Sequence, residues 1–432
     1  MNTTDSKVKK AAAAAKRDSF RLAALDERVR NGALARVIAT LEVSRDAIIE
    51  ENEKDIAAAR ANGLPDPIVK RLKFDGGKLD DVIAGIHDLI ALPDPIGKIL
   101  AKRQLDEGLV LEQATCPIGV VGVIFESRPD ALAQIASLCM KSGNCAVLKG
   151  GSEAKHTNRL LYETIHAAGT EVGFPAGFLT LIESREETAE LLGCHESIDL
   201  IIPRGSNAFV RYIMENSEIP VMGHADGVCH VYVDKAADIA KAVPIIRDSK
   251  VQYAAACNAV ETVLVHADVA ETLLPPLERE LRVNEVVIRG TQRVRDIIAG
   301  VEAASEDDWR TEYLDFIVSV KVVDDAEEAI DHINRYGSHH TDCIVTEDDE
   351  TAEKFMNLVD SASVYRNCST RFADGFRYGL GAEVGISTGK LHARGPVGLD
   401  GLTTYKYRLY GDGQIVEDYA EGRRSFHFRE IE

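Results

Sequence analysis

The stretch Ile118-Gly-Val-Val-Gly-Val-Ile124 is a short, almost wholly apolar run, and a helical pattern over Asp130–Met140 follows it. The same alternation continues with Ala146–Leu148 and then Glu153–Gly169. Buried strands of a parallel sheet have continuous apolar sequences, and a crossover helix must join one strand to the next. The stretch therefore predicts βαβ units, a parallel sheet and an α/β fold of the nucleotide-binding class.

The alternation extends downstream and forms two series. The first series ends with Leu179–Ile182, Glu186–Leu192, Leu200–Ile202 and Ser206–Glu215. The second comprises Val228–Val233, Ala236–Ile246, Thr262–His266, Val269–Leu281, Phe316–Val322, Ala326–Arg335, Thr341–Val345 and Thr351–Leu358, with Ser363–Tyr365 after it. Two series of this kind predict two α/β domains, the second of which contains Cys257.

The chain before about residue 95 has a helical pattern. One face carries Leu34, Val37, Ile38 and Leu41. Ser44 is a candidate N-cap and Gly63 a candidate helix stop. Two runs, Lys102–Leu105 and Leu109–Gln113, then flank Asp106-Glu-Gly108 and predict a β-hairpin that could reach a partner subunit. A strand-like run, Thr403–Tyr410, precedes a charged tail that we expect to be mobile.

Composition excludes several classes of protein. The 432 residues are 45% hydrophobic and 28% charged, which is typical of a globular protein of two or three domains. Lys and Arg number 50 against 70 Asp and Glu, so the net charge of −20 argues against nucleic-acid or anionic-membrane binding. The eight cysteines form no CxxC pairs, which argues against a disulfide framework and favours a reducing cytoplasm. The N-terminal alanine run is too short to span a membrane.

Two strand ends have the residues of a nucleotide site, although the GxGxxG motif is missing after the first strand. Lys149 precedes Gly150-Gly151-Ser152 and a helix, so it could hold a ribose or a phosphate; the alternative is a solvated lysine. Gly205 and Ser206 also begin a helix and could face a pyrophosphate, although an ordinary βα turn would have the same sequence.

Cys257 lies in Gln252-Tyr-Ala-Ala-Ala-Cys257-Asn258, among small side chains that let a substrate carbonyl approach the sulfur. The alternative is a small buried hydrophobic residue without a chemical role. Arg366, Arg371 and Arg377 lie near glycines and could bind an anionic substrate or simply be solvated. The adjacent side chains of His339-His340-Thr-Asp342-Cys343 lack the spacing of metal ligands, so we expect no metal site there.

Four motifs occur in one order: Pro117–Pro129, Leu148–Ser152, Pro203–Ser206 and Ala256–Asn258. With them the chain resembles the aldehyde dehydrogenase superfamily over roughly residues 5 to 416. Glu126-Ser-Arg-Pro129 and Gly379–Lys390 are similar to the branch of that superfamily that reduces glutamyl phosphate. The resemblance implies an aldehyde dehydrogenase-like fold with a Rossmann-type cofactor domain, an α/β catalytic domain and an extended β segment for oligomerisation.

The implied boundaries are 1–101 and 116–224 for the NADP-binding domain, 225–400 for the catalytic domain, 102–115 and 401–416 for the oligomerisation segment, and 417–432 for the tail. By resemblance, Cys257 is the nucleophile and Asn258 a catalytic neighbour. The implied cofactor ligands are Lys149, Ser152, Gly205, Ser206 and Glu312. Ser127 is the implied side-chain donor to the oxyanion, with the N–H of Cys257 as its partner.

Two departures from many aldehyde dehydrogenases bear on the chemistry. The run Val221-Met-Gly-His224-Ala-Asp-Gly227 has no glutamate to activate water, and Ser152 stands where NAD-preferring relatives often have a carboxylate. The resemblance therefore implies NADPH-dependent reduction of L-glutamyl 5-phosphate to L-glutamate 5-semialdehyde and phosphate through a Cys257 thioester, as the second step of proline biosynthesis. Glu153 beside Ser152 leaves NAD open as the cofactor.

Several alternatives stay open. An alignment shifted by one residue would exchange Ser127 for Arg128, which could instead bind the departing phosphate. Lys250, the nearest cation along the chain, or His224 could lower the pKa of Cys257. Arg366, Arg371, Arg377 and Lys390 are candidates for the amino-acid end of the substrate. A hydrolytic NAD(P)-dependent aldehyde dehydrogenase and a catalytically silent scaffold are the rival functions, and a homo-oligomer and contact with glutamate 5-kinase are the possible assemblies.

Overall fold

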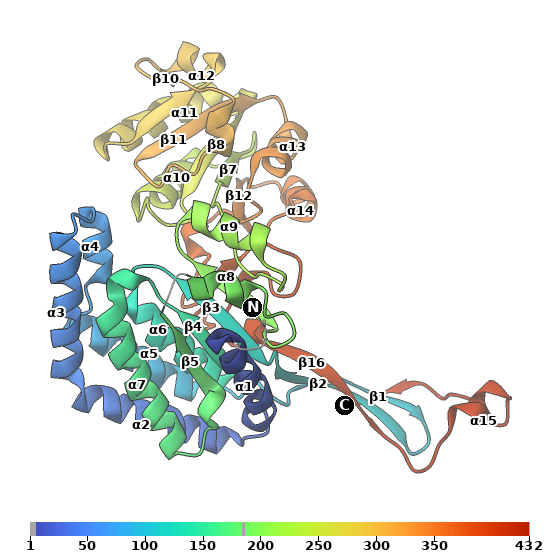
Figure 1. Ribbon diagram of the computed structural model, residues 1–432. Coiled ribbons are helices and arrows are strands. Elements are labelled where there is room, and N and C mark those ends of the chain that lie inside the picture. Colours follow the sequence, from blue (N-terminus) through green and yellow to red (C-terminus); the bar gives the residue numbers. More distant parts are fainter. Residues whose placement is uncertain (1–5, 184–185, 432) are drawn as a thin grey trace. The chain divides into compact units, whose positions relative to one another are not determined.

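A computed structural model describes residues 6–183 and 186–431 (Figure 1). The chain divides into two compact units, which are described separately. Unit 1 comprises Met1–Val221, Leu380–Val384 and Val397–Glu432, and unit 2 comprises Met222–Gly379 and Gly385–Pro396. None of the helices in the described ranges is long and apolar enough to cross a membrane.

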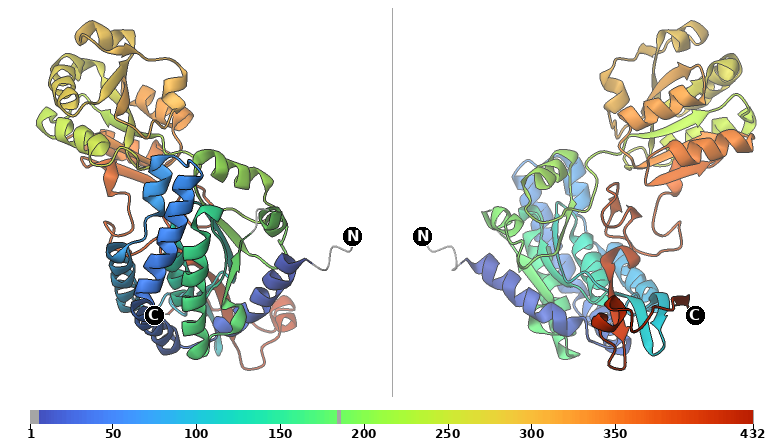
Figure 2. Two further views of the ribbon diagram at one scale, coloured as in Figure 1. Left: turned by 60° about the vertical axis from the view of Figure 1, so that its left-hand side comes forward. Right: turned by 90° about the vertical axis from the view of Figure 1, so that its right-hand side faces the viewer.

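Unit 1 begins with five helices: α1 (Lys7–Leu22), α2 (Glu27–Val43), α3 (Arg45–Ala61), α4 (Asp66–Leu72) and α5 (Gly76–Ala91). The predicted apolar face of α2 is buried. Both α2 and α3 pack along α7 (Lys155–Glu171), as Figures 1 and 2 show. Ser44 is the N-cap residue of α3, as predicted, although its hydroxyl makes no cap hydrogen bond. Gly63 follows α3 in the left-handed region, with φ of 68°, and ends the helix as predicted.

The sheet of unit 1 has four parallel strands in the order β5-β4-β3-β6. Its strands are β3 (Val120–Phe125), β4 (Cys145–Lys149), β5 (Leu179–Ile182) and β6 (Leu200–Arg204), and its other helices are α6 (Pro129–Lys141), α8 (Glu186–Leu192) and α9 (Asn207–Asn216). All six residues of β3 are buried. The strands β4 and β5 follow on one side of β3, and β6 then pairs with β3 on its other side. The carboxyl ends of β3, β4 and β6 therefore meet at a topological switch point, where ligands bind in open α/β sheets.

A separate antiparallel sheet of unit 1 has the order β16-β2-β1-β17 (Figure 1). The predicted hairpin is present as β1 (Ile99–Asp106) and β2 (Leu109–Pro117), and β16 (Thr403–Tyr410) pairs with β2 along its whole length. The tail, which we expect to be mobile from its charge, contains two elements in its described part. It forms α15 (Val416–Ala420) and β17 (Arg429–Glu430), which pairs with β1, while His427 Nδ1 lies 2.8 Å from Asp106 Oδ1.

Unit 2 contains a seven-stranded parallel sheet in the order β10-β9-β11-β8-β7-β12-β13. The strands are β7 (Cys229–Val233), β8 (Val260–His266), β9 (Val287–Gly290), β10 (Glu302–Ala303), β11 (Ile317–Val323), β12 (Thr341–Val345) and β13 (Ser363–Arg366). The helices are α10 (Ile239–Val251), α11 (Ala267–Val283), α12 (Gln292–Ile297), α13 (Ala326–Tyr336) and α14 (Asp349–Leu358). The sequence pattern missed β9, β10 and α12, because these elements have at most six residues and charges interrupt their apolar runs.

Alternation along the strands gives unit 2 a core on each face of its sheet. Val231 and Val263 pack with α10 and α11, whereas Tyr232 and Leu264 pack with α13 and α14. A small hairpin of β14 (Ile386–Ser387) and β15 (Gly395–Pro396) completes the unit.

Short 3-10 helices occur in both units, at Ser152–Ala154, Ala176–Phe178, Asp307–Arg310, Thr370–Phe372 and Asp400–Leu402.

Candidate active site

The loops that follow β3, β4 and β6 are bonded to one another at the switch point of unit 1. Ser127 donates from both its backbone N–H and its hydroxyl to Glu153 Oε1, each over 2.7 Å. Glu126 Oε2 accepts from the N–H of Ser206 over 3.0 Å. Ser127 has a φ of 46°, which is rare for a residue other than glycine, and the two bonds to Glu153 hold it in that conformation. The hydroxyl proposed as an oxyanion donor thus points its proton at a carboxylate, and Arg128 beside it is exposed.

A pocket of about 250 Å³ lies where β4 and β5 end. Its lining comprises Gly150, Gly151, Ser152, Lys155, Asn158, Leu181, Ile182 and Glu183. A Cβ atom on Gly150 would lie 2.3 Å from Asn158 Nδ2, so only glycine allows the backbone to pass there. Lys149 at the end of β4 donates from Nζ to the carbonyl of Gly150 over 2.5 Å.

A buried polar atom beside this pocket makes no hydrogen bond within the described part of the chain. Asn158 is 3% exposed, and its Oδ1 has no hydrogen-bond partner among the described residues. A buried acceptor without a donor costs about 1–3 kcal/mol, which a ligand N–H or O–H would recover. An adenosine presents such donors, so the pocket fits the adenosine end of a dinucleotide.

The charges around the pocket decide which dinucleotide it can accept. Glu153 is the carboxylate next to Ser152 that could favour NAD as the cofactor. It accepts hydrogen bonds from Ser127 and does not line the pocket. Glu183 does line it, but Arg159 binds both oxygens of that carboxylate over 2.5 and 2.7 Å. Lys155 supplies a cation. Among the described residues that line the pocket, no carboxylate is left uncompensated to repel a 2′-phosphate.

The Gly205–Ser206 turn begins α9. A Cβ on Gly205 would lie 2.5 Å from Glu126 Oε2 and 2.7 Å from Phe209 Cδ1, which excludes other residues unless these side chains move. Ser206 is the N-cap residue of α9 but makes no side-chain cap bond. Its hydroxyl is therefore not used by its own helix, although its N–H is bonded to Glu126.

Cys257 lies half-buried in the turn between α10 and β8 of unit 2, and its backbone is held tightly. Gly227 packs against it so closely that a Cβ there would lie 2.1 Å from the carbonyl oxygen of Cys257. The same carbonyl lies 3.3 Å from the Sγ of Cys229. The sequence identified the small neighbours of Cys257 but missed Gly227, which is distant in the chain.

Asn258 anchors the turn. Its Nδ2 donates to the carbonyl of Ala373 over 2.8 Å, and its own carbonyl accepts from Thr370 Oγ1 over 2.7 Å. These bonds join the Cys257 turn to the 3-10 helix Thr370–Phe372. Asn258 is therefore held by its side chain and its backbone next to Cys257.

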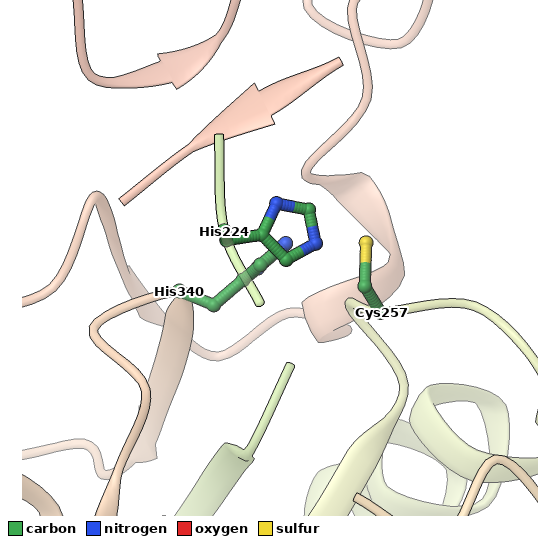
Figure 3. Close-up of side chains that lie close together, drawn as sticks. All are labelled: His224, Cys257 and His340. Atoms are coloured by element: carbon green, nitrogen blue, oxygen red, sulfur yellow. The ribbon is translucent and has the colours of Figure 1, made fainter. Parts of the chain in front are cut away.

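Two imidazoles lie beside Cys257 (Figure 3). The ligand atoms of Cys257, His224 and His340 all lie within 4.8 Å of one another. His224 Nδ1 lies 2.7 Å from the carbonyl oxygen of Ile386, and its other ring nitrogen turns toward the sulfur of Cys257 (Figure 3). His224 is one of the two predicted candidates for lowering the pKa of Cys257, whereas the sequence pattern does not connect His340 with Cys257.

Arg371 is a predicted arginine whose side chain is buried in unit 2. Its Nε donates to Gln252 Oε1 over 2.8 Å. Burial lowers the pKa of the Arg371 guanidinium, and the charge of the neighbouring Arg377 lowers it further, whereas the Cys257 thiolate raises it. Arg366 is occupied elsewhere, since its Nη1 lies 2.6 Å from Asp349 Oδ1.

Lys250, the other candidate for lowering the pKa of Cys257, forms an ion pair with a buried glutamate. Its Nζ lies 2.6 Å from Glu261 Oε2, and both side chains are fully buried. Burial raises the pKa of Glu261, and the ion pair with Lys250 opposes that shift. Glu312, one of the implied cofactor ligands, is half-exposed in the loop before β11 and also raises the pKa of Glu261.

The chain is similar to known proteins of one family. The model of the aldehyde dehydrogenase family matches residues 1–287. A gamma-glutamyl phosphate reductase of Acetivibrio thermocellus is 58% identical over 411 residues, covering 95% of each chain. One of Ruminiclostridium cellulolyticum is 57% identical over 408 residues, covering 94% of each. The crystal structure of the gamma-glutamyl phosphate reductase from Thermotoga maritima superposes with a TM-score of 0.93 at 38% identity, covering 95% of this chain and 100% of that one.

Proposed function

The chain belongs to the aldehyde dehydrogenase family, and on that premise we propose that it reduces L-glutamyl 5-phosphate to L-glutamate 5-semialdehyde and phosphate with NADPH. This is an oxidoreductase activity and the second step of proline biosynthesis from glutamate. The observation that carries the proposal is the fixed position of Cys257, with a half-exposed sulfur beside an imidazole and a backbone held by Gly227 and Asn258.

Cys257 acts as the nucleophile in this reaction. Its thiol proton passes to His224, and the thiolate attacks the carbonyl carbon of the acyl phosphate. The S–C bond forms as the C–O bond to phosphate breaks. The electron pair of the broken C–O bond leaves with the phosphate, and the phosphate takes the proton from His224. The run Val221–Gly227 lacks the glutamate that activates water in many aldehyde dehydrogenases, which favours reduction of the thioester over its hydrolysis.

Of the cofactor residues that the resemblance implies, Ser152 lines the pocket of unit 1 and Lys149 is the last residue of the neighbouring strand β4. Lys149, Ser152, Gly205, Ser206 and Glu312 would hold the cofactor, which supplies a hydride to the acyl carbon when it is bound. Lys155 and the compensated Glu183 support NADP over NAD. The N–H of Cys257 is the primary oxyanion donor, because the Ser127 hydroxyl must first leave Glu153 to serve in that role.

Among the substrate candidates, Arg371 is best supported as the group that binds an anionic end of the substrate. It is fixed by Gln252 and interacts with Cys257. Arg128 is exposed and stays a candidate for the departing phosphate. Arg366 would have to leave Asp349 to take part.

We also propose that the protein forms a homo-oligomer in the cytoplasm. The strand β16 is an edge strand with exposed Tyr405, Tyr407 and Leu409, so we propose that it pairs with a second copy of the chain as a homo-oligomer. The eight cysteines are free, which fits a reducing cytoplasm. Contact with glutamate 5-kinase would shorten the path of a reactive acyl phosphate.

The test is NADP reduction with glutamate 5-semialdehyde, with and without inorganic phosphate. The wild type should turn over only with phosphate, and Cys257→Ala should be inactive. Cys116→Ala, which removes another half-buried thiol, is the control and should be active. Turnover without phosphate would establish a hydrolytic dehydrogenase instead, and inactivity of every protein under both conditions would favour a silent scaffold.

A further inference from the structure

His224, Cys257 and His340 come from three segments that precede neighbouring strands of unit 2. His224 lies before β7, Cys257 before β8 and His340 directly before β12, and these strands are adjacent in the order β8-β7-β12. Because the strands are parallel, their amino ends lie at one edge of the sheet, and the three side chains meet there (Figure 3). Their ligand atoms lie within 4.8 Å of one another.

The hydrogen bonds of the two imidazoles orient their other nitrogens toward this meeting point. A carbonyl oxygen only accepts, so the 2.7 Å contact with Ile386 places the proton of neutral His224 on Nδ1 and a lone pair on Nε2. His340 Nδ1 lies 2.8 Å from Thr341 Oγ1, which can accept in the same way. Carbonyl and hydroxyl partners of this kind orient metal-binding histidines.

The Nε2 atom of His340 is an independent indication of a ligand. The residue is fully buried, and Nε2 makes no hydrogen bond within the part of the chain that the structure describes. A buried polar atom without a partner is unfavourable by about 1–3 kcal/mol. The reductase chemistry uses Cys257 and His224 and gives this nitrogen no function, so a separate ligand explains it better.

We propose that Cys257, His224 and His340 bind a Zn²⁺ ion, which blocks the nucleophile and reversibly inhibits the enzyme. One thiolate and two imidazoles are a ligand set that zinc prefers, with a fourth position left for water. Tetrahedral Zn–S and Zn–N bonds of about 2.3 and 2.0 Å require ligand atoms roughly 3.3–3.6 Å apart. Small side-chain rotations of the half-buried Cys257 and His224 can close the present separations.

Zinc binding at Cys257 releases a proton, and the number of protein ligands limits its strength. The thiol of Cys257 loses its proton to solvent as the S–Zn bond forms, so binding strengthens as the pH rises. Three protein ligands hold the ion less tightly than the four of a structural zinc site, so a chelator should reverse the inhibition.

The test uses the full-length, reduced and metal-free protein with Zn²⁺ alone, in the absence of substrate and phosphate. Zn²⁺ should bind once per chain and protect Cys257 from alkylation, and a chelator should restore the alkylation rate. His340→Asn should weaken this protection about tenfold or more while basal turnover is retained. His195→Gln, which removes an exposed histidine of unit 1, is the matched control and should bind like the wild type.

Equal protection by Zn²⁺ in His340→Asn and in the wild type would overturn the proposal. If His340→Asn does not fold, Co²⁺ bound to the wild type provides the second measurement. A thiolate-to-cobalt charge-transfer band that is lost in Cys257→Ala supports the site, and its absence from the wild type refutes it. Neither readout uses turnover, so a failure here is distinct from a failure of the proposed reductase activity.

Discussion

Replacing Gly227 by alanine should impair the reaction without removing any reactive group. The added Cβ would lie 2.1 Å from the carbonyl oxygen of Cys257 and 2.7 Å from its Cα and carbonyl carbon. Since Cβ contacts below 3.0 Å essentially never occur, the two backbones must separate by about 0.9 Å. A misplacement of about 1 Å at a reacting group reduces the rate roughly 100-fold.

The expected result is a fall of about 100-fold in kcat/KM for phosphate-dependent NADP reduction, with a loss of stability of about 1–3 kcal/mol from overpacking. Calorimetry should show that the variant is folded. Gly85→Ala is the control, because no atom lies within 4 Å of its added Cβ and Gly85 lies inside α5. It should keep wild-type activity and gain about 0.5–1 kcal/mol. Wild-type kcat/KM in Gly227→Ala would refute the view that this close contact positions Cys257.

Three further predictions concern charge. Lys250→Met leaves the buried Glu261 without its partner and should lower the free energy of unfolding by about 3–5 kcal/mol in denaturant titrations, and adding Glu261→Leu should recover part of that loss. Ser152→Glu places a carboxylate in the dinucleotide pocket and should lower kcat/KM for NADP relative to NAD by about tenfold or more; an unchanged ratio would contradict the assignment. Burial lowers the pKa of His332 to about 2, below the ordinary 6.5, so only the unfolded chain takes up this proton as the pH falls below 6.5. This histidine therefore contributes stability above pH 6.5 that is lost toward acid at about 1.4 kcal/mol per pH unit, and unfolding of His332→Phe should be less sensitive between pH 6.5 and 5.

Much of the fold could be predicted, because the strongest signals are local. The apolar run at 118–124 predicted β3, and all six residues of that strand are buried. The α/β fold, the family and the reductase class are confirmed by the matches to known proteins. The elements missed, β9 and α12, are too short for a periodic pattern to be recognised.

The details of the site depend on contacts between distant residues, which the sequence does not reveal. Gly227 and Cys257 are 30 positions apart, and the glycine has no motif of its own. His340 joins Cys257 only because β7, β8 and β12 are neighbours in the sheet. The tail was predicted to be mobile from its charge, yet His427 and Tyr419 both bond to Asp106 at the end of β1.

The most direct test of the covalent route is a rapid-mixing experiment with glutamate 5-semialdehyde and NADP in the complete absence of phosphate. The account predicts a single burst of one NADPH per active chain, after which turnover stops because the Cys257 thioester has no acceptor. Adding phosphate should restart turnover, and Cys257→Ala should give no burst. Continued NADPH formation without phosphate, or a burst in Cys257→Ala, would contradict it.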